Sequence, residues 1–151
     1  MEKFQTFKSK VVPLPLKDVD TDLIIPAQYL TSISREGFGE NLFRRLREQD
    51  ENFPLNKEEY SGAQILVADD NFGCGSSREH AVWALTGAGF KVVIAKSFAD
   101  IFFSNSAKNG LLLITLEEAL VDEILAADNC ELEVDLENQE VRFSDGRAVS
   151  F

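Results

Sequence analysis

From residue 63 onward the sequence alternates short apolar runs with amphipathic segments, and this alternation constrains the fold more than any other feature. The apolar runs predict three buried strands, at residues 63–68, 90–95 and 111–115. The segments that follow them predict helices, at residues 77–88, 100–109 and 116–127. Strands and helices that alternate in this way build a parallel α/β sheet.

Both ends of the chain predict further β structure. Residues 4–29 mix β-prone runs with Pro13 and Pro15, which resist a regular helix. Residues 131–151 alternate apolar and polar side chains with a break at 144–146, a pattern typical of an antiparallel hairpin or meander. The expected fold class is therefore α/β, with a parallel strand–helix core and additional antiparallel β structure.

The stretch between the N-terminal β structure and the alternating region is less regular. Residues 31–39 are polar and contain glycine, so they predict an exposed and mobile loop. Residues 40–48 predict a short amphipathic helix with three apolar side chains on one face, namely Leu42, Phe43 and Leu46.

The composition predicts a single acidic domain, residues 1–151. With 44% hydrophobic residues among 151, the chain can bury one core of ordinary size. The 26 acidic against 15 basic residues give a formal charge of −11, which argues against binding to nucleic acid or to anionic membranes. An anionic substrate would therefore have to be attracted by a local feature, because the overall field repels it.

Membrane insertion, secretion and a zinc or iron–sulfur site are not predicted. No apolar run approaches the roughly 20 residues of a membrane span, and the N-terminus lacks the apolar core of a signal peptide. The two cysteines, Cys74 and Cys130, have no paired spacing, and His80 is the single histidine. We therefore expect a cytoplasmic protein with reduced thiols, and no zinc or iron–sulfur site formed by this chain alone.

Residues 71–81, which read Asn-Phe-Gly-Cys-Gly-Ser-Ser-Arg-Glu-His-Ala, carry the predicted chemistry. They follow a strand and open a helix, and their two glycines allow a tight turn and a close approach to a ligand. The two hydroxyls of Ser76 and Ser77 and the guanidinium of Arg78 then lie where free backbone N–H groups favour an anion. The turn predicts a carboxylate or phosphate site in which Ser76 could also transfer a proton.

Other interpretations of these residues compete with that one. Ser76 with Glu79 three residues later is also a capping box, which needs no ligand. The glycine pair invites dinucleotide binding, but Arg78 stands where the third glycine belongs. Cys74 could be a nucleophile paired with His80. Three nearby acids could hold a hard cation or form a solvated turn, namely Asp18, Asp20 and Asp22.

The same motif resembles the signature of the small subunits of 3-isopropylmalate dehydratase, which share a module with the last domain of aconitase. Three further stretches match in the right order: residues 19–26, residues 37–39, and residues 96–102 with Asn105 following. The resemblance spans nearly the whole chain. It implies a swivelling β/β/α domain that closes over a four-iron four-sulfur cluster on a separate large subunit, with no cofactor held by this chain.

The resemblance also implies an activity and a set of roles. The reaction is the removal and re-addition of water that interconverts 2- and 3-isopropylmalate, small dicarboxylates of leucine biosynthesis, and the small subunit is inactive alone. By motif, Ser76 is the catalytic base, Ser77 and Arg78 hold substrate carboxylate oxygens, and Asp22 is the active-site aspartate of the Thr-Asp turn.

Substrate identity stays partly open. The loop after residues 23–26 is thought to contact the variable group of the substrate, and an apolar Leu30 suits an isopropyl group. Arg35 lies close enough in the sequence to leave a homoaconitate-type or methylmalate-type hydro-lyase as an alternative, beside a non-catalytic anion-binding module. Family members usually continue beyond the equivalent of Phe151, so a well-folded core with impaired activity is expected.

Overall fold

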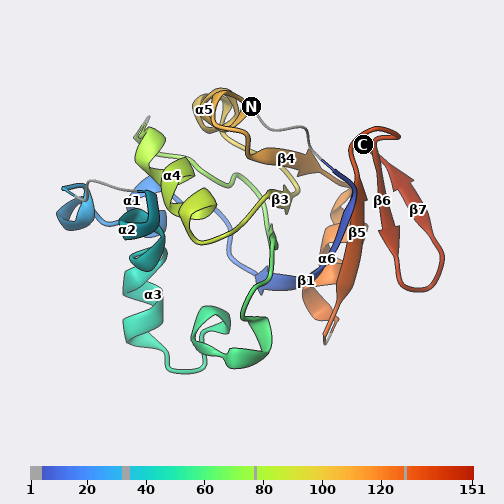
Figure 1. The fold of residues 1–151 in the computed structure, drawn as a ribbon, viewed down its shortest axis with the longest axis horizontal. Helices are drawn as coiled ribbons and strands as arrows, with labels where there is room; N and C mark the ends of the chain where they lie inside the picture. The colour runs from blue at the N-terminus through green and yellow to red at the C-terminus, as the bar shows by residue number, and fades with distance from the viewer. Residues whose placement is uncertain (1–4, 32–34, 77, 128) are drawn as a thin grey trace.

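The computed structural model describes residues 5–31, 35–76, 78–127 and 129–151, and its centre is a mixed seven-stranded sheet of order β4-β3-β2-β1-β5-β6-β7 (Figure 1). The strands are β1 Phe7–Leu14, β2 Ile65–Ala68, β3 Val92–Ala95, β4 Leu112–Thr115, β5 Glu131–Asp135, β6 Glu140–Phe143 and β7 Ala148–Ser150. The predicted α/β class and the antiparallel tail are confirmed.

β1 joins the two halves of the sheet. It pairs in parallel with β2, which continues through β3 to β4, and it pairs antiparallel with β5, which continues through β6 to β7. The four parallel strands therefore end at the same edge, where their carboxyl ends carry the loops that follow Leu14, Ala68, Ala95 and Thr115. Ligand sites of open α/β sheets form at this edge.

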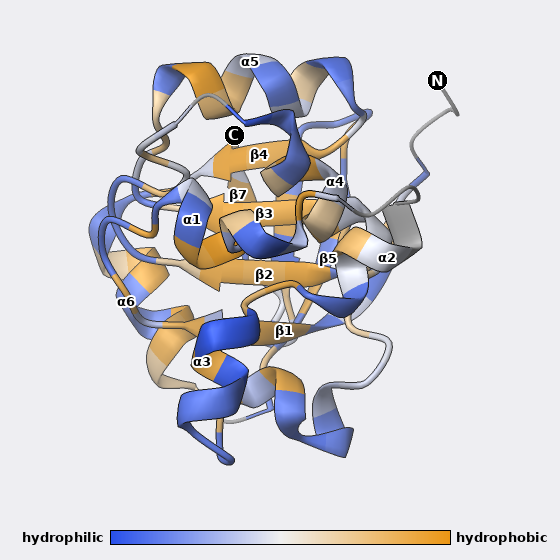
Figure 2. Ribbon diagram, turned by 90° about the vertical axis from the view of Figure 1, so that its left-hand side faces the viewer, coloured by the Kyte–Doolittle hydropathy of each residue, from blue (hydrophilic) through white to orange (hydrophobic). Residues whose placement is uncertain are grey.

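Helices cover both faces of the parallel half. They are α1 Thr21–Ile24, α2 Arg35–Glu40, α3 Arg44–Gln49, α4 Glu79–Gly87, α5 Asp100–Lys108 and α6 Glu118–Ala126, with short 3-10 turns η1 Ala27–Tyr29, η2 Pro54–Asn56 and η3 Glu58–Tyr60. Figure 2 shows that the strands of the parallel half are mostly apolar, whereas the helices around them mix polar and apolar residues. The helices predicted after β2, β3 and β4 are confirmed as α4, α5 and α6.

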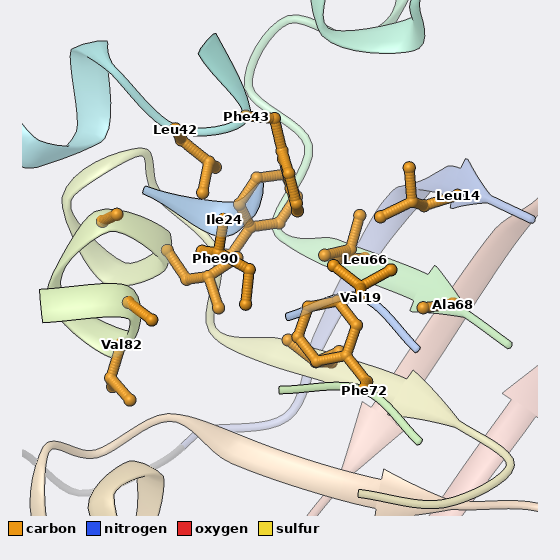
Figure 3. Packing of buried hydrophobic residues seen from close by; sticks show 14 of the residues in the cluster. Leu14, Val19, Ile24, Leu42, Phe43, Leu66, Ala68, Phe72, Val82 and Phe90 are labelled. Atoms are coloured by element: carbon orange, nitrogen blue, oxygen red, sulfur yellow. The ribbon is translucent and has the colours of Figure 1, made fainter. Parts of the chain in front are cut away.

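Alternate residues of the strands feed two separate cores, as the two-residue period of a strand requires. Val12, Leu66 and Val93 point to the face covered by α1, α2 and α4, where Ile24, Phe43 and other apolar residues surround them (Figure 3). The intervening residues of the strands point to the opposite face, which α6 covers: Val11, Ile65, Val67, Val92 and Ile94. The buried strands are apolar on both faces for this reason.

The region before β2 differs from the prediction. Within residues 31–39 the structure places the start of α2, and Phe38 and Gly39 are buried. Gly39 is needed because a Cβ there would lie 2.4 Å from the carbonyl carbon of Gly87 at the end of α4. The helix predicted over 40–48 is broken at Phe43, which has a left-handed φ of 53° and separates α2 from α3. Long-range packing against α4 therefore overrides the polar local sequence.

Among the helices that the structure describes, none is long and apolar enough to cross a membrane.

Candidate active site

The predicted motif turn lies at the carboxyl ends of the parallel strands, between two other loops. Single bridges pair Asp20 with Cys74 and Phe72 with Phe98, so the turn continues the parallel pairing beyond β1, β2 and β3. Gly73 N–H donates to the Val19 carbonyl at 2.7 Å, and the Cys74 carbonyl accepts from Thr21 N–H at 2.9 Å. These bonds fasten the turn beside α1, the short helix that carries Asp22.

Both glycines of the turn occupy backbone conformations that favour glycine. Gly73 has φ +85°, and an added Cβ would lie 2.2 Å from Cγ of Phe102 on α5. Gly75 has φ +93°, and its Cβ would approach the Cβ of Asp20 to 3.3 Å. The turn therefore sits in direct contact with α5 on one side and with the residue before α1 on the other.

A polar network fixes the start of the turn. Asn71 has a left-handed φ of 57° and donates from its side chain to Asp18 Oδ1 at 2.9 Å. Its backbone N–H donates to Ser97 Oγ at 2.8 Å, and the Ser97 hydroxyl in turn donates to Asp70. Ser97 thus anchors the turn, a role that its position just before α5 does not reveal in the sequence.

The structure brings Asp22 close to Arg78. Arg78 Nη1 lies 3.6 Å from Asp22 Oδ1, and Ala27 N–H donates to the same oxygen at 3.3 Å. A second arginine, Arg45 of α3, donates to Asp22 Oδ2 at 2.5 Å. That hydrogen bond, helped by the Ala27 N–H and the charge of Arg78, holds the pKa of the Asp22 carboxyl below its usual value, so Asp22 is ionised near neutral pH.

The Arg78 guanidinium has an N–H that can donate to a further hydrogen-bond acceptor. Its side chain is 26% exposed, yet Nη1 is buried and finds no hydrogen-bond acceptor among the residues that the structure describes. A buried guanidinium N–H without an acceptor is costly, whereas a carboxylate would satisfy it with a strong, charge-assisted bond.

Ser76 lies two residues before Arg78 and is exposed. The capping-box interpretation is wrong: α4 begins at Glu79, its N-cap residue is Arg78, and no side chain caps it. The Ser76 carbonyl accepts a hydrogen bond from Arg78 N–H at 2.9 Å. The serine side chain is therefore available for chemistry instead of holding a helix end.

The remaining predicted binding residues are Ser77 and Leu30. Ser77 lies outside the described residues. Leu30 is the residue after η1, half-buried against the first core, and its contact with a substrate stays a prediction.

The competing interpretations of the motif lose support. Burial and the nearby acids Asp20 and Asp18 raise the pKa of the Cys74 thiol, the opposite of what a nucleophile needs. His80 packs edge-on between Phe38 and Trp83, with ring centroids 5.4 and 4.9 Å away.

The acids after β1 do not form a cation site. Asp20 caps α1, Asp18 accepts from Asn71 and Asp22 contacts the arginines. In the described part of the chain no three acidic, histidine or cysteine side chains are grouped to hold a metal.

Comparison with known proteins agrees with this geometry. The family model described as Aconitase C-terminal domain matches residues 1–119, and one described as LeuD_N matches residues 118–151. The chain is 52% identical over 156 residues to the 3-isopropylmalate dehydratase small subunit of Francisella tularensis subsp. novicida, covering 100% of this chain and 81% of that protein. The chain belongs to the family of 3-isopropylmalate dehydratase small subunits.

Other members of the family give the same result. The small subunit from Ruegeria pomeroyi is 51% identical over 161 residues, covering 100% of this chain and 80% of that protein. The crystal structure of 3-isopropylmalate dehydratase (leuD) from Methanocaldococcus jannaschii matches with a TM-score of 0.78 and 36% identity, covering 97% of this chain and 81% of that one. The names of the two small subunits imply a larger partner for those proteins.

Proposed function

We propose that this chain is the small subunit of a cytoplasmic 3-isopropylmalate dehydratase that interconverts 2- and 3-isopropylmalate in leucine biosynthesis. The observation that carries the proposal is the state of the Arg78 guanidinium. Its Nη1 lies 3.6 Å from Asp22 Oδ1, is buried and has no hydrogen-bond acceptor among the described residues. Ser76, two residues earlier in the chain, is exposed. An anionic substrate completes this arrangement.

In this proposal, three residues of the motif have different roles in dehydration. Arg78 binds a substrate carboxylate, and Ser77 contributes a hydroxyl to the same group. Ser76 takes the proton from the carbon next to that carboxylate, the electrons of the broken C–H bond form the double bond, and the hydroxyl leaves the neighbouring carbon with the electrons of its C–O bond, as hydroxide. The proton taken by Ser76 and this hydroxide together make up the water that the reaction removes. A serine alkoxide is a poor base in water, so it depends on nearby cationic and N–H donors. Arg78, two residues further along the chain, is a cationic donor of this kind.

The metal chemistry belongs to a partner in this proposal. Cys74 and Cys130 lie on separate elements, and the described residues form no ligand group for a cluster, so a large subunit would hold the four-iron four-sulfur cluster. When bound there, the cluster supplies a Lewis acid for the leaving hydroxyl.

The proposed partners are this large subunit and a small dicarboxylate. The charge of −11 supports a role without nucleic acid or anionic membrane. The apolar, half-buried Leu30 favours isopropylmalate over a substrate with a further carboxylate.

Anaerobic reconstitution tests the proposal. The chain is mixed with the matching cluster-bearing large subunit, and formation of the unsaturated intermediate from 3-isopropylmalate is followed. We expect turnover only with both chains, and a loss of kcat of about a hundredfold or more in Ser76→Ala. Ser104→Ala, an exposed serine on α5, is the matched control and should turn over normally. Turnover by Ser76→Ala at the rate of the control would disprove the assigned base.

A further inference from the structure

Asp22 is shared between two arginines, and its two contacts differ. Arg45 Nη1 lies 2.5 Å from Oδ2, a hydrogen-bond distance, whereas Arg78 Nη1 lies 3.6 Å from Oδ1, too far for a hydrogen bond. We propose that Arg45 is a positioning residue that keeps the Asp22 carboxylate beyond hydrogen-bond distance of Arg78 Nη1, which leaves that N–H available to a substrate carboxylate. The inference rests on the proposed function.

The backbone brings Arg45 to Asp22. Phe43 is fully buried in its left-handed conformation, and its N–H donates to the Ile24 carbonyl at 2.8 Å. This bond fastens the start of α3 to the end of α1. Asp22 lies two residues before Ile24 and Arg45 two residues after Phe43, so one anchored contact places the two charged side chains opposite each other.

Both oxygens of Asp22 have a partner other than Arg78. Ala27 N–H donates to Oδ1, and Arg45 donates to Oδ2. The carboxylate cannot turn toward Arg78 without giving up one of these bonds. The unsatisfied donor of Arg78 is therefore maintained by the two anchors of Asp22, and a substrate carboxylate can use it without first displacing a protein carboxylate.

The neighbouring Arg44 provides a matched control. It donates to Asn41 Oδ1 at 2.9 Å and to the Glu40 carbonyl at 3.2 Å, and its guanidinium lies 5.9 Å from the ring centroid of Tyr29. These contacts direct it away from Asp22. Arg44→Gln thus removes the same charge from the same helix without removing an anchor of the aspartate.

Loss of Arg45 should create an internal competitor. In Arg45→Gln, Asp22 keeps only the Ala27 bond and can move onto Arg78, where it occupies the donor meant for the substrate. An exposed ion pair of this kind corresponds to a change of about fivefold in affinity at most. The side chains of Asp22 and Arg45 are 40% and 48% exposed, so solvent screening is included in that limit.

The test measures the affinity of isopropylsuccinate, a dicarboxylate that lacks the hydroxyl and cannot be dehydrated. It is titrated by anaerobic calorimetry into the complex with the matching large subunit, and turnover of 3-isopropylmalate is measured alongside. We expect Arg45→Gln to raise Kd and KM by up to about fivefold while kcat changes little, and Arg44→Gln to bind like the wild type.

A double substitution separates positioning from a general loss of charge. Adding Asp22→Asn to Arg45→Gln removes the competitor, so the affinity for isopropylsuccinate should return toward the wild-type value. The same Asp22→Asn change should bring no gain when Arg45 is present.

Three results would overturn the inference. If Arg45→Gln binds like Arg44→Gln, or if Asp22→Asn recovers nothing, Arg45 does not position Asp22, and the proposed function stands as long as the wild-type complex turns over. If the wild-type complex neither binds isopropylsuccinate nor turns over, the proposed function fails and the inference fails with it.

Discussion

The contact between Gly73 and Phe102 should make the motif turn at residues 71–76 sensitive to substitution. In Gly73→Ala the new Cβ would lie 2.2 Å from Cγ of Phe102 while φ stays near +85°. The left-handed conformation costs a non-glycine residue about 1 kcal/mol or slightly more. Overpacking against a buried ring adds about 1–3 kcal/mol. We therefore expect the free energy of unfolding to fall by about 2–4 kcal/mol.

Gly62 supplies the control that separates the two contributions. It has nearly the same φ, +79°, but a Cβ there would meet no atom within 4 Å. Gly62→Ala should therefore cost only the backbone contribution, about 1 kcal/mol. The difference between the two variants isolates the clash with Phe102.

Urea unfolding of the chain, followed by the fluorescence of Trp83, measures both variants. Trp83 is the single tryptophan, and its indole N–H donates to Asn109 at 3.0 Å, so its environment reports on the fold. A double-mutant cycle with Phe102→Leu should show that Gly73→Ala costs less once the ring is removed. Equal losses of unfolding free energy in Gly73→Ala and Gly62→Ala would refute the reasoning. They would mean that the Phe102 side chain moves aside without loss of stability.

Two further predictions concern polar groups. Hydrogen bonds from the side chain and backbone of Asn138, and a further one from Arg142, lower the pKa of Asp135 from 3.8 to about 2. The ionised Asp135 therefore stabilises the fold fully above pH 3.8, and this stabilisation is lost as the pH falls toward 2. Urea unfolding between pH 2 and 7 should show this loss of stability in the wild type. Asp135→Asn should be less stable than the wild type at pH 7, and its free energy of unfolding should change less with pH. The prediction would be contradicted if the free energies of unfolding of both proteins changed with pH in parallel. Asn71→Gly and Asn71→Ala should both lose the side-chain hydrogen bond to Asp18, but only alanine is strained by the left-handed backbone at this position. Asn71→Ala should therefore be about 1 kcal/mol less stable than Asn71→Gly in the same urea assay. Equal stabilities of the two variants would show that the strain is absent.

The parallel core could be predicted because its signals are local. Runs such as 63–68 and 90–95 are continuous, apolar and short, and glycine or polar residues bound them, so the strands were found within two residues of their ends. The tail at 131–151 alternates with a period of two, which a half-buried antiparallel strand requires.

The region before β2 could not be predicted because its structure depends on distant residues. Phe38 and Gly39 belong to a polar stretch, and only the close approach of α4 explains why a helix forms there and is buried. Phe43 breaks the helix predicted over 40–48 because its left-handed backbone ties α3 to Ile24. Local propensity is a weak prior when such contacts oppose it.

The motif points to the residues of the candidate site, and their roles stay predictions. The glycines, Ser76, Arg78 and Asp22 were identified from their spacing and resemblance, and the structure brings Asp22 and Arg78 together. No local signal predicts that the Ser97 hydroxyl accepts the Asn71 N–H. Arg45 was missed because no local pattern relates a basic residue of α3 to an aspartate 23 positions earlier.

The charges around Asp22 also explain why an acidic chain can serve an anionic substrate, and why it should need a partner. Arg45 and Arg78 carry two positive charges against one negative charge on Asp22, so these three groups together carry one net positive charge. A dicarboxylate brings two negative charges, so one carboxylate remains uncompensated by these three groups. A carboxylate desolvated without a partner charge is costly. The remaining compensation has to come from outside this cluster, and a large subunit closing over the site is the source that the family resemblance provides.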